Sequence, residues 1–518
     1  MFRQLGLPAW VALYLFAVPL AIIVGVSISD PLAPTSLLAL AMIIGLGVAP
    51  IVLRFYHESL IVAWNSALVI FFLPGRPTLA MALVALCLLM AVVNRAMVRQ
   101  PLMLPARSIT APLLVLGAVV FLTAAISGGV TGRAFGGEMW GARRYAATVF
   151  GIIGFFALAS RPVPVERAGL LTALFFLSAV TSALGDLAYS MGWEYLFLIL
   201  STDVAILQAA SEYFGSFVRL TGVCWAAWAV FNFLLMRYGI SGLLDFTRPH
   251  RLILAIAAFA GTMLGGYRSY IVLSALLIGI LFLLEGLHRT KVLAVAIALG
   301  ALTLGLVLPN VRSLPLAFQR SLSILPVDID PVAKHDAQGT LDWRFEMWKA
   351  VIPEVPQYLL IGKGFAYSGT DYYLTQEAFR RGLIRASYED TIISGNYHNG
   401  ILTLIIPFGI WGVLAFIWFC TAACRALIRN YRYGDTRLKT LNRFLLASFL
   451  MRLIFYVGVY GQFDLDIATF TGLIGMSVAV NGGIRSPVEA PVSAPTAPAP
   501  EPTFPRRRRR IGPSLNPA

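Results

Sequence analysis

Charged residues are scarce in this sequence of 518 residues. Asp, Glu, Lys and Arg make up 13% of the chain and hydrophobic residues make up 58%, whereas soluble domains average about 25% charged residues. A protein in water would have to bury nearly all of this apolar surface. The composition therefore excludes a set of soluble domains and indicates an integral membrane protein.

Cysteine is also rare. The four cysteines, Cys87, Cys224, Cys420 and Cys424, all fall in or beside apolar runs. This placement excludes a disulfide framework and a Cys-x-x-Cys metal motif. We therefore interpret the four thiols as small apolar side chains.

Acidic residues are fewer than basic ones: the chain has 25 Asp and Glu and 40 Lys and Arg, which gives a net charge of +15. In a membrane protein this excess is expected from positive residues in cytoplasmic loops, and it does not point to nucleic acid as a partner. With the N-terminus placed in the cytoplasm, the short external loops contain almost no Lys or Arg. Both termini are therefore predicted to be cytoplasmic.

The apolar runs predict an all-α polytopic membrane protein with about 12–14 transmembrane helices. Candidate spans begin near Ala9, Ala33, Glu58, Pro77, Thr110, Arg143, Ala168, Ser216, Arg251, Ser269, Lys291, Asn399, Asn442 and Asp464. A crossing needs about 20 residues of helix, and the third and fourth candidates are shorter than the others.

The chain is divided here into five parts by its long connections. These are the N-terminal helices (1–215), helices with external arginines (216–309), a large external loop (310–397), the C-terminal helices (398–484) and a tail (485–518). The loop is rich in aromatic residues and is expected to fold, with a helix in the stretch from Trp343 to Gly364. The tail is rich in Pro, Ala and Arg, and is expected to be disordered in the cytoplasm with its arginines against anionic lipid.

Two arginines are candidates for binding phosphate. Arg219 and Arg268 are predicted at the external ends of two spans, at the same depth in the membrane. A guanidinium at this depth can make bidentate contacts to phosphate oxygens. The alternative interpretation is an arginine that reaches from the span end to the lipid headgroups.

His398 opens the twelfth predicted span. The positive end of a helix dipole favours the neutral imidazole, and a neutral imidazole can accept a proton from an attacking hydroxyl. The alternative is a histidine with a purely structural role.

Together, these residues resemble the superfamily of O-antigen ligases and Wzy-type O-antigen polymerases. The motifs that carry the resemblance are Arg219-Leu220-Thr221-Gly222, Gly266-Tyr267-Arg268-Ser269, Arg344…Trp348, Gly362-Lys363-Gly364, His398-Asn399-x-x-Leu402 and Gly409-x-x-Gly412. They span about Arg219 to Gly412, and the long loop lies between them. The chain departs from the family pattern at Tyr267, Thr403 and Pro407.

The resemblance implies a GT-C-like, inverting, metal-independent glycosyltransferase without a cofactor in the bacterial inner membrane. The donor would be a glycan on undecaprenyl diphosphate, and the active site would face the periplasm. Arg219 and Arg268 would bind the diphosphate, Arg344 would contact donor or acceptor, His398 would activate the acceptor hydroxyl, and Asn399 would support it. The acceptor, a lipid A core or another glycan, stays open, as does ligase versus polymerase. Polysaccharide-assembly proteins are further partners that this role suggests.

Two Asp-x-Asp pairs, Asp328-x-Asp330 and Asp464-x-Asp466, resemble the metal-binding motif of enzymes that use nucleotide sugars. Both pairs are predicted on the external side, where nucleotide sugars are absent, so no metal site is expected. Arg452, in the thirteenth span, needs a partner inside the protein, and we expect a carboxylate at the external end of a span, such as Asp186 or Asp464.

A transporter or flippase of lipid-linked glycans is the alternative function, since 12–14 spans also suit that class. Transporters tend to be built from repeated halves with broken helices at the midplane. The external grouping of arginines and histidine favours an enzyme, and a passive assembly scaffold leaves this grouping unexplained.

Overall fold

The fold is described from a computed structural model in which residues 9–29, 33–73, 75–98, 101–129, 139–202, 219–383 and 388–487 are described. The chain divides into two compact units, Met1–Arg485 and Ser486–Ala518, and the following description concerns the first. Residues 488–518 of the predicted tail, with its arginine run, lie outside the described residues.

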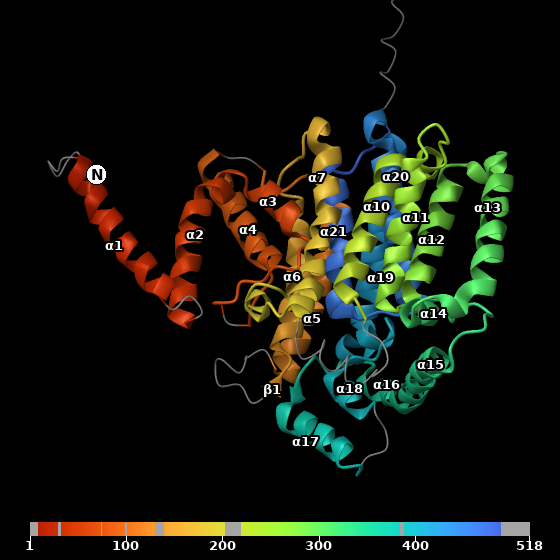
Figure 1. Cartoon of the computed structure of the whole chain (residues 1–518). Coiled ribbons are helices and arrows are strands. Elements are labelled where there is room, and N and C mark those ends of the chain that lie inside the picture. Colours follow the sequence, from red (N-terminus) through yellow and green to blue (C-terminus); the bar gives the residue numbers. More distant parts are fainter. Residues whose placement is uncertain are drawn as a thin grey trace, which may run out of the picture. The chain divides into compact units, whose positions relative to one another are not determined.

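The first unit is built almost entirely from helices (Figure 1). The helices before the long loop are α1 (Ala9–Ser29), α2 (Pro34–Arg54), α3 (Tyr56–Ala63), α4 (Leu79–Val98), α5 (Arg107–Ser127), α6 (Ala142–Leu158), α7 (Val165–Leu177), α8 (Ala183–Met191), α10 (Thr221–Leu243), α11 (His250–Thr262), α12 (Arg268–Leu284) and α13 (Val292–Val307). The helices after it are α19 (Leu402–Tyr433), α20 (Lys439–Gly458) and α21 (Phe463–Asn481).

The predicted all-α polytopic fold is confirmed. Among the described residues, eight helices are long and apolar enough to cross a membrane, or nine if one bent pair is a single span. This is fewer than the predicted 12–14. The helices α6, α11 and α12 contain only 17, 13 and 17 residues, and α2 and α3 form the bent pair. The predicted third span is wrong as a separate crossing: α3 has eight residues, about 12 Å of helix, and it meets α2 at a bend of 108°.

Small residues let the central helices approach closely. A Cβ atom on Gly151 of α6 would lie 2.6 Å from Ile467 Cγ2 of α21. On α21, Gly472 and Gly475 make similarly close approaches to Trp64 and Leu158. Close backbone approach at small residues is a common way to pack membrane helices, because lipid supplies no hydrophobic force between them.

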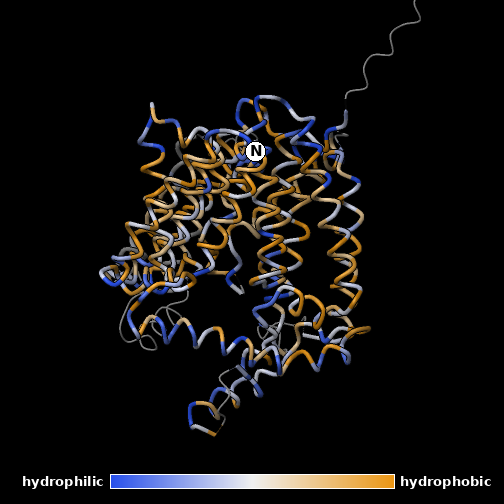
Figure 2. The backbone as a smooth tube through the Cα atoms, turned by 90° about the vertical axis from the view of Figure 1, so that its right-hand side faces the viewer, coloured by the Kyte–Doolittle hydropathy of each residue, from blue (hydrophilic) through white to orange (hydrophobic). Residues whose placement is uncertain are grey.

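The outer helices differ from this centre. The most apolar window of α21 is 83% buried, whereas that of the span that begins with α13 has no buried residue. In Figure 2 the apolar colour follows the long helices, and polar colour gathers at their ends and in the segment beyond one end. The exposed surface of α13 therefore suits contact with lipid.

The long loop folds, as expected, into a largely helical segment. It contains α14 (Leu316–Leu322), α15 (Pro331–Val351), α16 (Val355–Tyr358), α17 (Gly369–Arg380) and α18 (Glu389–Ser394), which gather at one end of the long helices (Figure 1). We refer to this end as the loop side. A short antiparallel pair joins β1 (Met139–Trp140) to β2 (Tyr367–Ser368). The helix predicted from Trp343 begins earlier, at Pro331, with Asp330 as its cap.

The loop is attached to a break in α19. Pro407 and Gly409, which has a φ of 63°, interrupt the helix, and this exposes backbone groups that the segment 359–364 uses. Lys363 N–H donates to Ile406 O at 2.8 Å, Gly364 N–H donates to Pro407 O at 2.9 Å, and Ile410 N–H donates to Leu359 O at 2.8 Å. The two glycine motifs of the sequence therefore meet in one backbone contact. We call residues 359–364, which make this contact with α19, the docked segment.

Candidate functional site

His398 lies in the short connection between α18 and α19. Its φ of 50° is rare for a residue other than glycine and costs about 1 kcal/mol or more. Asn399 Oδ1 accepts hydrogen bonds from Ile401 N–H at 3.0 Å and from Leu402 N–H at 3.1 Å. Asn399 thus acts as a cap of α19, which fixes the peptide next to His398.

The imidazole of His398 lies between two aromatic side chains. Its ring centroid is 5.2 Å from that of Trp343 and 5.3 Å from that of Tyr460. Burial, and then the positive charge of Arg344, lower the pKa of His398 to about 4. The imidazole is therefore neutral at pH 7, as the sequence predicted, although the main cause is burial rather than a helix dipole.

Arg344 of α15 is the charged neighbour of His398. Its guanidinium carbon lies 5.5 Å from the centroid of the Tyr460 ring, at cation–π distance. Its Nε atom is buried without a hydrogen-bond partner, and no described carboxylate lies within 4.0 Å. Burial lowers the pKa of Arg344, Tyr460 opposes that shift and Arg320 adds to it. A desolvated guanidinium with free hydrogen-bonding capacity is suited to binding an anion.

Arg219 shares a carboxylate with an arginine that the sequence analysis did not identify. Arg219 Nη2 lies 3.1 Å from Asp336 Oδ2, and Arg320 Nε binds the same oxygen. Arg320 also donates to Gly266 O and, at 3.3 Å, to Thr340 Oγ1. Burial first, then the nearby charge of Arg320, lower the pKa of Arg219.

Arg268 completes the group. It is the first residue of α12, directly after the turn at Gly266, whose φ is 66°. A Cβ atom on Gly266 would lie 3.6 Å from Arg320 Cδ and 3.7 Å from Arg219 Nε, so this turn passes beside both arginines. Arg268 has no described carboxylate within 4.0 Å, and the charges of Arg320, Arg344 and Asp336 all act on it.

The structure thus brings Arg219, Arg268 and Arg344 together with Arg320, and we call these four residues the arginine cluster. Among the described ion pairs, Asp336 is the one carboxylate bound to any of them. Such an excess of positive charge in a partly buried place attracts a polyanion. Planar guanidiniums match phosphate oxygens in particular.

Arg320 could not be singled out from the sequence because it is one of many basic residues in the long loop. Its side chain is only 6% exposed, although a basic residue in a polar loop is expected to be exposed. No local pattern distinguishes it from Arg312, whose side chain is 65% exposed.

The Asp-x-Asp pairs have other partners. Asp464 lies 2.9 Å from Arg144 Nη2, and Asp466 binds Arg452. Arg452 therefore has the expected partner, a carboxylate at the end of a span, but this carboxylate is Asp466 and not Asp186 or Asp464, the two that were named as examples. Asp328 pairs with exposed Arg312, and Asp330 caps α15.

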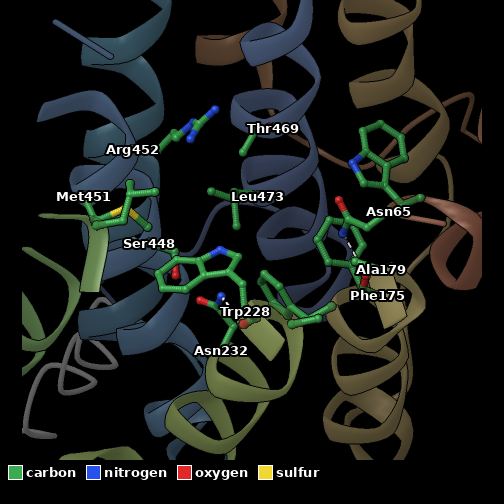
Figure 3. A pocket seen from close by; sticks show the side chains of 14 residues that line it. Asn65, Phe175, Ala179, Trp228, Asn232, Ser448, Met451, Arg452, Thr469 and Leu473 are labelled. Atoms are coloured by element: carbon green, nitrogen blue, oxygen red, sulfur yellow. Dashed lines mark hydrogen bonds between the residues drawn. The ribbon is translucent and has the colours of Figure 1, made fainter. Parts of the chain in front are cut away.

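A cavity of about 200 Å³ lies among the spans. Its lining includes side chains from α7, α10, α20 and α21 (Figure 3). Trp228, Asn232, Ser448 and Arg452 are among its lining residues, and none of the predicted site residues is. Ser448 Oγ is buried there without a described partner. We place the candidate site at the arginine cluster and His398, because the charges and the neutral imidazole meet there and not in this cavity.

Fold and site together define a polytopic, all-α membrane protein with a folded loop over a basic site. Residues 253–417 match the family model described as O-antigen ligase, which confirms the resemblance inferred from the motifs. The match includes Arg268, Arg320, Asp336, Arg344 and His398, and it begins after Arg219. The general class is a membrane glycan ligase or polymerase. The comparison with curated proteins gave no match.

Proposed function

We propose that this protein transfers a glycan from undecaprenyl diphosphate to an acceptor hydroxyl, at the periplasmic face of the bacterial cytoplasmic membrane. The observation that carries the proposal is a partly buried, neutral histidine beside Arg344, at one end of the arginine cluster. Both termini would then be cytoplasmic, and the acceptor would be a lipid A core or another glycan. Ligase and polymerase share this chemistry and differ in the acceptor.

In the proposed reaction, the acceptor oxygen attacks the anomeric carbon of the donor sugar while the bond from that carbon to the diphosphate oxygen breaks. His398 takes the hydroxyl proton or orients the hydroxyl. Attack opposite to the leaving group inverts the anomeric configuration. Negative charge grows on the departing diphosphate, and Arg219, Arg268 and Arg320 stabilise it. Guanidiniums supply here the positive charge that a divalent metal supplies elsewhere.

Binding of the donor would itself raise the pKa of His398. An imidazole whose pKa is about 4 is a weak base in the empty site. Since the charge of Arg344 contributes to that low pKa, a bound diphosphate near Arg344 would offset it and raise the pKa. Basicity would then increase when the donor is present.

His398→Ala tests this mechanism. Purified protein in detergent would receive lipid-linked glycan and an acceptor with EDTA present, and products would be resolved by chain length and attached lipid. We expect transfer by the unmodified protein and a decrease of about 100- to 10,000-fold in the variant, the range for loss of a general base. The exposed His335→Ala is the matched control and should remain active.

Full activity of His398→Ala would remove His398 from the mechanism. Loss of activity in EDTA that Mg²⁺ restores would contradict the metal-independent reaction. Flipping of the lipid-linked glycan without any transfer would favour the transporter.

A further inference from the structure

The long loop supplies both the anion that occupies the arginine cluster and a cation beside His398. Asp336, Thr340 and Arg344 follow each other at intervals of four residues on α15, so they share one face of this helix. Asp336 lies at Arg219 and Arg320, and Arg344 lies at His398 and Tyr460. Eight residues of helix separate them by about 12 Å, and α15 therefore spans the site.

The contact of Asp336 is the kind that a phosphate group would make. A single carboxylate oxygen, Oδ2, binds Arg219 and Arg320, and the Asp336 side chain is 17% exposed. Carboxylates and phosphates bind guanidiniums through the same N–H groups. A diphosphate that enters the cluster therefore competes with Asp336 for the same donors.

Electrostatic repulsion disfavours the simultaneous presence of Asp336 and a diphosphate in the arginine cluster. A diphosphate ester brings two negative charges, and Asp336 would face them at short range in a partly desolvated place, where like charges repel strongly. The guanidiniums of Arg219, Arg268 and Arg320 can neutralise the diphosphate best when the carboxylate moves away. Arg320 would keep its bond to Gly266 O and so remain in position to receive the phosphate.

We propose that Asp336 is an internal competitor of the donor diphosphate. In the empty site it occupies Arg219 and Arg320; diphosphate binding displaces it and releases the start of α15. This inference rests on the proposed function and adds a regulation to it: donor occupancy is coupled to the position of the loop helix that carries Arg344. The cost of displacing Asp336 lowers the affinity for diphosphate, because a ligand must supply that free energy itself.

The test is the affinity of the purified full-length protein for inorganic pyrophosphate, measured by calorimetry in detergent. Asp336→Asn keeps the shape of the side chain and removes its charge, and we expect it to bind pyrophosphate about ten times more tightly. Asp342→Asn is the matched control, since Asp342 is exposed on the same helix, and its affinity should equal that of the unmodified protein. Asp336→Glu keeps the negative charge and should therefore not show the tighter binding that we expect of Asp336→Asn.

The outcomes separate this inference from the proposed function. Equal or weaker binding by Asp336→Asn, with pyrophosphate bound by the unmodified protein, would overturn the competition and leave the phosphate site standing. No binding by either protein would overturn the phosphate site itself, and the inference with it. Farnesyl diphosphate, titrated in parallel, should give the same ratio between the two proteins and bind more tightly than pyrophosphate if a lipid-linked diphosphate is the ligand.

Asp336→Asn leaves Arg219 and Arg320 without their carboxylate and is expected to lower the melting temperature without ligand. The decisive value is therefore the increase in melting temperature that pyrophosphate causes. That increase should be larger in Asp336→Asn than in the unmodified protein, and an increase of the same size or smaller would contradict displacement.

Discussion

At the scale of single residues, the site depends on groups that burial has perturbed. His398 combines an unusual φ with a low pKa, and Arg344 is desolvated without a described carboxylate. Strained and perturbed residues concentrate where proteins bind or react. Two consequences can be measured on the transfer reaction.

The first is the pH dependence. With His398 as base, kcat/KM should stay level from about pH 7 to pH 5 and fall as the pH approaches 4, since the pKa in the empty site is about 4 and kcat/KM reports the free enzyme. The fall in kcat should occur at higher pH, because the bound diphosphate raises the pKa. In Arg344→Gln, the pH values at which kcat/KM and kcat fall should both move towards the ordinary pKa of histidine, about 6.5.

The same pKa shift affects folding. The unfolded chain takes up a proton at His398 below about pH 6.5, whereas the folded protein resists it until about pH 4. The free energy of unfolding therefore decreases as the pH falls through this window. Melting temperatures recorded over the same range separate this effect from the chemistry, and a fall in kcat/KM at pH 6.5 in a fully folded protein would contradict the assignment.

The second consequence concerns Arg320, whose charged hydrogen bonds join Gly266, Asp336 and Thr340. Arg320→Gln removes one guanidinium from the proposed diphosphate site and should raise the KM for the donor at least about tenfold, since a charged hydrogen bond contributes about 1.5–3 kcal/mol. Arg312→Gln, at an exposed ion pair in the same loop, should leave KM unchanged. Equal effects of both substitutions on steady-state kinetics would indicate a general charge effect.

At the scale of elements, the docked segment connects the loop to α19. A Cβ atom on Gly362 would lie 2.1 Å from Pro407 O and 2.6 Å from Phe408 N, so no side chain fits between the two backbones. Gly362→Ala should lower the free energy of unfolding by about 1–3 kcal/mol, the usual range for overpacking. Thermal unfolding in detergent measures it.

The control for Gly362→Ala lies on α15, where a Cβ atom on Gly339 would meet nothing within 4 Å. Gly339→Ala should be neutral or stabilising, because alanine favours helix. If the melting temperature of Gly362→Ala equals that of the unmodified protein, the backbone contact at Pro407 is not as close as described.

The sequence predicted the positions of the helices along the chain better than the angles and contacts between them. Apolar runs located the helices, and their motifs led to Arg219, Arg268 and His398. The break between α2 and α3 was predicted, but α3 was interpreted as a crossing of its own, because hydropathy gives no angle between consecutive helices. The choice of Asp466 over Asp464 as partner of Arg452 depends on two residues of one helix. The meeting of Arg320 with Arg219 depends on packing between segments about 100 residues apart. Hydropathy contains no information on such contacts.

At the scale of the whole molecule, the predicted topology places the loop side in the periplasm. α19 is apolar along one full crossing, so residues before and after it should lie on opposite sides of the membrane. Asp371→Cys, exposed on α17, and Arg437→Cys, exposed before α20, test this with a membrane-impermeant maleimide. Intact spheroplasts should label position 371 and not 437, and lysis should expose 437.

The unmodified protein is the control for labelling, since three of its four cysteines are buried and Cys424 is partly so. Labelling of position 437 alone in intact spheroplasts would invert the orientation and place the arginine cluster in the cytoplasm. Labelling of both positions would contradict α19 as a crossing.

The docked segment also determines which part of the loop can open. Two of its hydrogen bonds are made to Ile406 O and Pro407 O of α19, which are buried residues. Separating buried backbone groups is costly, whereas the bonds of Asp336 can be exchanged for those of a ligand. The docked segment is thus harder to separate than the contact of Asp336. If α15 moves, we expect it to pivot near its C-terminal turn, Ile352–Glu354, which is close in sequence to the docked segment. The entrance for the donor would then form at the phosphate-binding end of the site. The end with His398 would stay assembled, so that the acceptor hydroxyl could bind there after the donor.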